Sequence, residues 1–144
     1  MQMALQDFLL SLGTANTPHG KGSLLNHLKG VHDLLRDWDN GDDVCNAGLF
    51  HSIYGTSSFK HKSLHDRDAL TRQIGPYAED LVYQFSVGDR PLFKNVGSKT
   101  MRWQLQEIEA ANLVEQHAGH KALQQLLPMK LSNGARAAIL LELA

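Results

Sequence analysis

The sequence predicts an all-α protein, a bundle of about six to eight helices. Three observations support this fold class. Apolar residues recur at helical spacing in most segments of the 144-residue chain, and glycine, proline and helix-capping residues separate those segments. No segment alternates apolar and polar residues as a strand does. Because internal repeats and low-complexity tracts are also lacking, we expect residues 1–144 to form one helical domain.

The first two predicted helices are separated by a loop. Apolar residues lie at helical spacing over residues 4–12, and residues 14–22 contain glycines, a proline and polar residues. Ser23 is a suitable N-cap for a second helix that runs to about residue 38. His27 lies beside the apolar stripe of this helix, so we expect its side chain to point inward.

A third predicted helix begins near Val44 and carries small residues. Val44, Ala47, Gly48 and His51 share one face at helical spacing. Because Ala47 and Gly48 have almost no side chain, another helix can approach closely beside His51. Within residues 46–56 the apolar run is followed by polar residues and a glycine, so we expect the end of this helix to place polar side chains in a site.

The remaining helices are predicted to begin at about residues 67, 76, 100, 120 and 133. The helix that begins near residue 100 has an apolar stripe that an amide, Asn112, interrupts. The predicted N-caps after the second helix are Asp42 or Asp43, Asp66, and Ser132 or Asn133.

Three inward polar residues on separate helices form the candidate site. His27, His51 and Asn112 each interrupt an apolar face. A buried polar group is costly unless it is paired, so helices that each bring one tend to bring them together. The alternative is that each side chain is satisfied separately by its own neighbours.

Composition excludes several classes of function. Lys and Arg number 14 against 15 for Asp and Glu, a net charge of −1 that gives no electrostatic case for nucleic acid or an anionic membrane. Cys45 is the single cysteine, so a disulfide framework and a thiolate zinc site are excluded. No segment reads as a signal peptide or a membrane span, and we expect a cytoplasmic protein. Eight histidines point to metal or proton chemistry.

The order of these residues resembles the HD-domain superfamily. His27 on one helix is followed by Ala47-Gly-Leu-Phe-His51-Ser52, where that superfamily has an apolar run and a His-Asp doublet. The interval of 24 residues between His27 and His51 suits the stringent-response (p)ppGpp hydrolases. Residues 21–27, 68–82 and 111–113 also resemble segments of that branch, and the resemblance is strongest over residues 18–116.

The departures from this family bear on its chemistry. The resemblance implies a divalent metal, commonly manganese, held by two histidines and two aspartates, but Ser52 and Asn112 stand where the aspartates would be. Gly55 and Thr56 occupy the positions of the Glu-Asp pair that serves hydrolysis. We therefore expect no ordinary (p)ppGpp hydrolysis, and either no cofactor or a weakly held divalent metal with His27 and His51 as ligands.

A second resemblance concerns the stretch His51-Ser-Ile-Tyr-Gly-Thr56. It is similar to the H-S-[IV]-Y-G-T box of a separate group of small domains of uncharacterised function. Residues 78–83 and Asp89-Arg90 match two further motifs of that group. This resemblance implies a distinct residue set and does not name a substrate.

Candidate roles follow from side-chain chemistry. We expect His51, Ser52 and Tyr54 to form a catalytic cluster, since Tyr54 lies three residues after His51 and its hydroxyl can donate to a phosphate or carbonyl. The residues expected to bind the substrate are His19, Lys21, Thr56, Arg90 and Asn112.

Two hypotheses about function remain open. One is an enzyme that acts on a nucleotide or another phosphorylated small molecule, metal-free or with a histidine-bound metal such as zinc or iron. The other is a non-catalytic ligand-binding or protein-interaction module that kept the pocket and lost the reaction. A homodimer formed through the small-residue helix faces is a further alternative.

Overall fold

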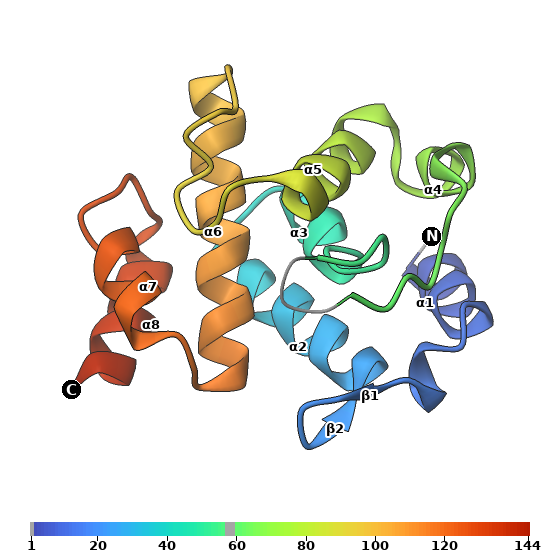
Figure 1. Cartoon of the computed structure of the whole chain (residues 1–144), viewed down its shortest axis with the longest axis horizontal. Coiled ribbons are helices and arrows are strands. Elements are labelled where there is room, and N and C mark those ends of the chain that lie inside the picture. The colour runs from blue at the N-terminus through green and yellow to red at the C-terminus, as the bar shows by residue number, and fades with distance from the viewer. Residues whose placement is uncertain (1, 57–59) are drawn as a thin grey trace.

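The computed structural model describes residues 2–56 and 60–144, with side chains from residue 5 onward, and confirms the all-α fold (Figure 1). The α-helices in the described part are α1 (Gln2–Ser11), α2 (Leu24–Asp37), α3 (Asp42–Leu49), α4 (Arg67–Ile74), α5 (Pro76–Val87), α6 (Lys99–Gln116), α7 (His120–Leu126) and α8 (Asn133–Leu143). None of them is both long enough and apolar enough to cross a membrane.

The long helix α6 stands between two groups of helices. Figure 1 shows α7 and α8 on one side of it and α2, α3 and α5 on the other. Its apolar stripe is buried, and so are several polar side chains, among them Glu107, Glu109 and Asn112. Buried carboxylates need partners. Glu107 finds them in the side chain of Asn40 and in Ser132, whereas Glu109 and Asn112 belong to the site.

Small residues let α2 and α3 pack closely. Ala47 and Gly48 are buried in α3, and a Cβ atom at position 48 would lie 2.3 Å from Cδ1 of Leu35 in α2. Ala110 and Ala111 are likewise buried in α6. The faces that suggested a homodimer are therefore used inside the fold, and they present no surface to a second copy.

Helix capping agrees with the sequence at three of four positions. Ser23, Asp66 and Ser132 are the N-caps of α2, α4 and α8, and each side chain accepts a backbone N–H. The prediction for α3 was wrong, because Gly41 is its N-cap and both Asp42 and Asp43 lie in its first turn. Acidic residues in a first turn still favour the helix through its dipole.

Two other predictions need correction. Residues 14–22 are not a plain loop: they contain a 3₁₀ turn, Thr14–Asn16, and a strand β1 (Pro18–His19) that pairs antiparallel with β2 (Gly22–Ser23). The third helix does not extend to His51, since α3 ends at Leu49 and turns follow to residue 54. His51 is thus presented by a buried turn after the helix, close to the end of α3.

Candidate functional site

The three inward polar residues of the sequence meet in the structure. His27 comes from α2, His51 from the turn after α3, and Asn112 from α6. Asn112 Oδ1 lies 2.9 Å from Nε2 of His27 and 3.1 Å from Nε2 of His51. All three side chains are buried. The interrupted apolar stripes therefore bring these polar groups to a common point.

His51 presents an unprotonated ring nitrogen to this point. Its Nδ1 lies 2.8 Å from the carbonyl oxygen of Gly48, which can only accept a hydrogen bond. Burial, with the neighbouring charge of His27 as the second cause, lowers the pKa of His51 to about 3. The ring is therefore neutral near pH 7 and carries one proton, which belongs on Nδ1 because that contact is shorter. Nε2 of His51 then holds a lone pair.

His27 also faces two acceptors. Its Nδ1 is hydrogen-bonded to the carboxylate of Glu115, and its Nε2 faces Asn112 Oδ1. All four ring nitrogens of the two imidazoles thus face an acceptor. The amide oxygen of Asn112 is satisfied separately, because Gln116 Nε2 donates to it at 2.9 Å.

The orientation of Asn112 is fixed by a buried carboxylate. Asn112 Nδ2 donates to Glu109 Oε1 at 3.0 Å, and Arg90 Nε donates to Glu109 Oε2 at 2.9 Å. Because a carboxylate only accepts, the amide nitrogen must face Glu109 and the amide oxygen must face the histidines. Arg90, a predicted substrate-binding residue, therefore also positions Asn112 through Glu109.

A cavity of about 250 Å³, the histidine cavity, lies beside this cluster. Its walls include six of the predicted site residues: His19, His51, Ser52, Thr56, Arg90 and Asn112. The Oγ atom of Ser52 is buried and has no hydrogen-bond partner among the described residues. A buried hydroxyl without a partner costs free energy unless a ligand or water completes it.

A second cavity of about 540 Å³, the hairpin cavity, adjoins the histidine cavity and shares His19, Gly20 and Gln116 with it. His27 and Lys21 line it, and His19 stacks on His27 with 4.1 Å between ring centroids. Burial, followed by the charge of His27, lowers the pKa of His19. His27 and Lys21 thus line the hairpin cavity, whereas Ser52 and His51 line the histidine cavity, and the His27 and His51 rings meet between the two with 5.2 Å between centroids.

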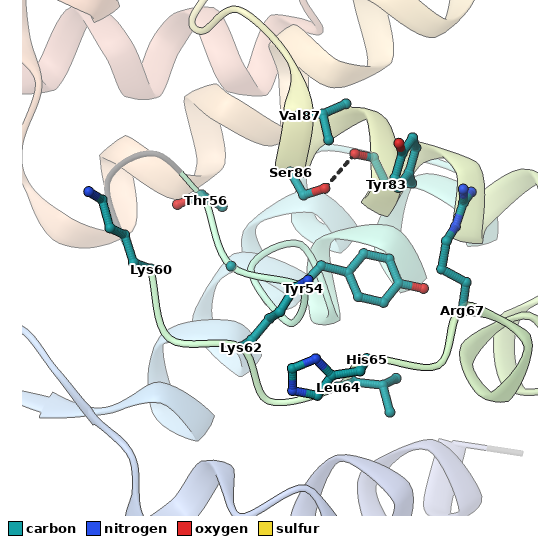
Figure 2. Close-up of a pocket in the computed structure, with 11 residues that line it drawn as sticks. Tyr54, Thr56, Lys60, Lys62, Leu64, His65, Arg67, Tyr83, Ser86 and Val87 are labelled. Carbon is teal, nitrogen blue, oxygen red and sulfur yellow. Dashed lines mark hydrogen bonds between the residues drawn. The ribbon is translucent and has the colours of Figure 1, made fainter.

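Tyr54 is not part of the predicted catalytic cluster. The turn after α3 directs it towards α4 and α5, where its hydroxyl donates to Glu79 Oε2 at 2.7 Å. It lines a third cavity, the tyrosine cavity of Figure 2, which shares only Thr56 with the histidine cavity. The expectation of an adjacent Tyr54 rested on a continuous helix through residue 54, and the helix ends before it.

The donor set does not fit the metal that HD-domain enzymes use. Ser52 and Asn112 bring no negative charge to the two imidazoles, and the carboxylates of Glu109 and Glu115 are engaged by Arg90 and His27. Over residues 2–56 and 60–144, no three His, Cys, Asp or Glu side chains are grouped to hold a metal ion. A hard divalent cation needs anionic oxygen ligands, and both carboxylates of this cluster are already engaged by other side chains.

Sequence reasoning missed three residues that complete the cluster. Glu109, Glu115 and Gln116 lie three residues before, three after and four after Asn112, so they share its face of α6. Their helical spacing from Asn112 was the available signal. Because charged and amide side chains on a helix are more often exposed to solvent, the sequence alone did not indicate that these three contact Asn112 or the histidines.

Comparison with protein families gives one match. Residues 8–90 match a family described as a domain of unknown function (DUF6817), and the chain belongs to this family. No curated protein matches the chain, and no solved structure does. The matched segment carries His19, His27, His51, Ser52 and Arg90, whereas Asn112 comes from the segment that follows it.

Proposed function

We propose that this protein binds a small phosphorylated molecule, such as a nucleotide, in the histidine cavity. The observation that carries the proposal is the buried hydroxyl of Ser52, which has no hydrogen-bond partner within residues 2–56 and 60–144 and lies in a wall shared with His51 and Arg90. Ser52 offers a donor, and Arg90, although paired with Glu109, brings a permanent positive charge, which suits the oxygens of a phosphate group. The histidine cavity and the adjoining hairpin cavity together offer room for a ligand larger than phosphate alone.

The scaffold itself is proposed to be HD-like. The support is the order of the residues along the chain and their convergence, in which His27, His51 and Asn112 meet from three segments. On this view the chain retains the histidines of that superfamily and has lost its acidic metal ligands. The reaction would then differ from metal-assisted hydrolysis, since Ser52 and Asn112 cannot activate a metal-bound water as a carboxylate set does.

Catalysis is a second candidate, favoured by the state of His51. A neutral imidazole whose Nδ1 donates to Gly48 keeps a lone pair on Nε2, although Asn112 Oδ1 lies 3.1 Å from that nitrogen. Such a nitrogen can accept a proton from a bound substrate. A pKa of about 3 makes it a weak base, however, and His27 lies outside the histidine cavity. Binding without turnover is therefore the function that the geometry supports better.

A thermal-shift screen with nucleotides and phosphorylated metabolites tests the proposal. A ligand present at about 100 times its dissociation constant should stabilise the protein by about 2.7 kcal/mol. Ser52→Ala should weaken a ligand found in this way by about tenfold, because one hydrogen bond to a charged acceptor is lost. Asn112→Ala should weaken it as well.

Ser11→Ala is the matched control, because the Ser11 hydroxyl is exposed and bonded to the carbonyl of Phe8. It should leave the affinity unchanged. A ligand whose affinity is the same in the Ser52→Ala and Asn112→Ala variants would place binding elsewhere. Absence of any response across the screen would favour a protein-interaction module. Product formation with the ligand found, lost in His51→Gln, would establish the catalytic alternative.

A further inference from the structure

The tyrosine cavity plays no part in the function proposed above. It has a volume of about 370 Å³, within the range of small-molecule sites. Figure 2 shows Tyr54 between two walls, with Tyr83, Ser86 and Val87 of α5 on one side and Lys62, Leu64 and His65 of the preceding loop on the other.

The walls of this cavity carry an excess of positive charge. Lys60, Lys62 and Arg67 line it, and none of its described lining residues is a carboxylate, although the chain as a whole has a net charge of −1. The charge of Arg67 is neutralised by the carboxylate of Glu79, to which its Nε and Nη2 atoms donate at 2.7 and 2.8 Å. Lys60 and Lys62 form no hydrogen bond or ion pair with the rest of the described chain. Two ammonium groups at one cavity therefore remain without a counter-charge.

The cavity also offers a fixed aromatic surface. The guanidinium of Arg67 lies 3.7 Å from the ring centroid of Tyr83, and Glu79 joins Arg67 to the hydroxyl of Tyr54. Burial would raise the pKa of Glu79, but the hydrogen bonds from Arg67 and Tyr54 outweigh it and lower the pKa. The carboxylate therefore stays ionised at neutral pH and holds Arg67, Tyr54 and, through Arg67, Tyr83 in place. Leu64 and Val87 complete an apolar rim.

We propose that the tyrosine cavity binds a small aromatic anion, with the charged group at Lys60 and Lys62 and the ring against Tyr54 and Tyr83. The lysines supply donors for a phosphate or carboxylate group, and the preformed tyrosine wall supplies apolar contact without further ordering of these side chains. This site is separate from the histidine cavity, although Thr56 lies between the two.

Four probes separate the parts of this proposal in a calorimetric or NMR titration at neutral pH and low salt. Phenyl phosphate and benzoate carry both the ring and the charge, phenol carries only the ring, and inorganic phosphate carries only the charge. We expect at least one of the aromatic anions to bind and both phenol and inorganic phosphate to bind at least about tenfold more weakly. The stronger of the two aromatic anions identifies the preferred charged group.

The double variant Lys60→Gln/Lys62→Gln should weaken the aromatic anion by about tenfold or more, because two charge-assisted contacts are lost. Lys99→Gln/Lys121→Gln removes the same charge from two exposed lysines outside the cavity and should change the affinity less than about twofold. Tyr83→Leu should weaken phenyl phosphate and leave inorganic phosphate unchanged.

Ser52→Ala distinguishes this site from the histidine cavity, because it should not affect the aromatic anion. Loss of binding in Ser52→Ala with no effect of Lys60→Gln/Lys62→Gln would overturn the assignment. If both double lysine variants weaken binding of the aromatic anion equally, the effect is due to net charge alone, and the assignment is also overturned. If neither aromatic anion binds, the proposal is wrong, while the function proposed for the histidine cavity is unaffected.

Discussion

The hydroxyl of Tyr54 donates a 2.7 Å hydrogen bond to the carboxylate of Glu79, and both side chains are buried. Tyr54→Phe should lower the free energy of unfolding by about 1.5 kcal/mol, because a hydrogen bond to a charged acceptor is lost inside the protein. Urea unfolding at pH 7 measures this change.

Tyr77→Phe is the matched control for Tyr54→Phe. The hydroxyl of Tyr77 is exposed and donates to Gln104, so its loss should change the free energy of unfolding by less than about 0.5 kcal/mol. Equal effects of the two substitutions would mean that the buried bond adds no stability to the native state.

Gly48→Ala should destabilise the protein despite the better helix propensity of alanine. The new Cβ atom would meet Leu35 Cδ1 at 2.3 Å in a fully buried position. Overpacking of this kind costs about 1–3 kcal/mol, and alanine returns at most about 1 kcal/mol of helix propensity. We expect a net loss of about 1 kcal/mol in urea unfolding. Gly97→Ala, where no atom lies within 4 Å of the new Cβ, should be close to neutral.

The low pKa of His51 predicts a loss of stability in acid. The folded protein holds this ring neutral down to about pH 3, whereas the unfolded chain binds a proton below its ordinary pKa of 6.5. The unfolded state therefore gains protons first as the pH falls, and stability decreases from about pH 6.5 downward. At pH 5.5 this group alone should cost about 1.4 kcal/mol.

His51→Gln isolates this contribution from the other groups. The variant should be less stable than the wild type at pH 7.5, and the difference between them should shrink by about 1.4 kcal/mol at pH 5.5. Chemical unfolding of both proteins at the two pH values checks this. A constant difference would show that His51 is not held neutral.

Ser52→Asp/Asn112→Asp tests the proposed HD-like scaffold. The two substitutions place carboxylates beside His27 and His51, which gives the two-histidine, two-aspartate ligand set that the resemblance implies. We expect this variant to gain stoichiometric manganese by elemental analysis and to be stabilised by it in thermal unfolding. Asn112→Asp alone should gain much less. If the wild-type protein retains stoichiometric manganese through dialysis against a chelator, the view that this site no longer binds the metal of the HD-domain enzymes is contradicted.

Helix positions and the convergence of the polar residues could be predicted because both depend on local spacing. His27 and Asn112 lie on apolar stripes, and a stripe fixes which way a helix faces. The two-residue strands β1 and β2 were missed because so short a segment has no measurable alternation.

The location of Tyr54 could not be predicted for a different reason. The end of α3 at Leu49 depends on how the following turns pack, and five residues of turn reverse the direction that a helix would have given. The buried carboxylate of Glu109 and the half-buried one of Glu115 were missed because their partners, Arg90 and His27, are distant in the sequence. Such pairs arise only from tertiary packing.

The position of α6 has a consequence for the borders of the family. The family match ends at residue 90, but α6 begins at Lys99, buries its apolar stripe against α2 and α5, and supplies Asn112 to the histidines. A fragment of residues 8–90 would expose those apolar helix faces to water, and we expect it to aggregate. The segment that the family model matches is therefore shorter than the helical bundle in which its apolar faces are buried.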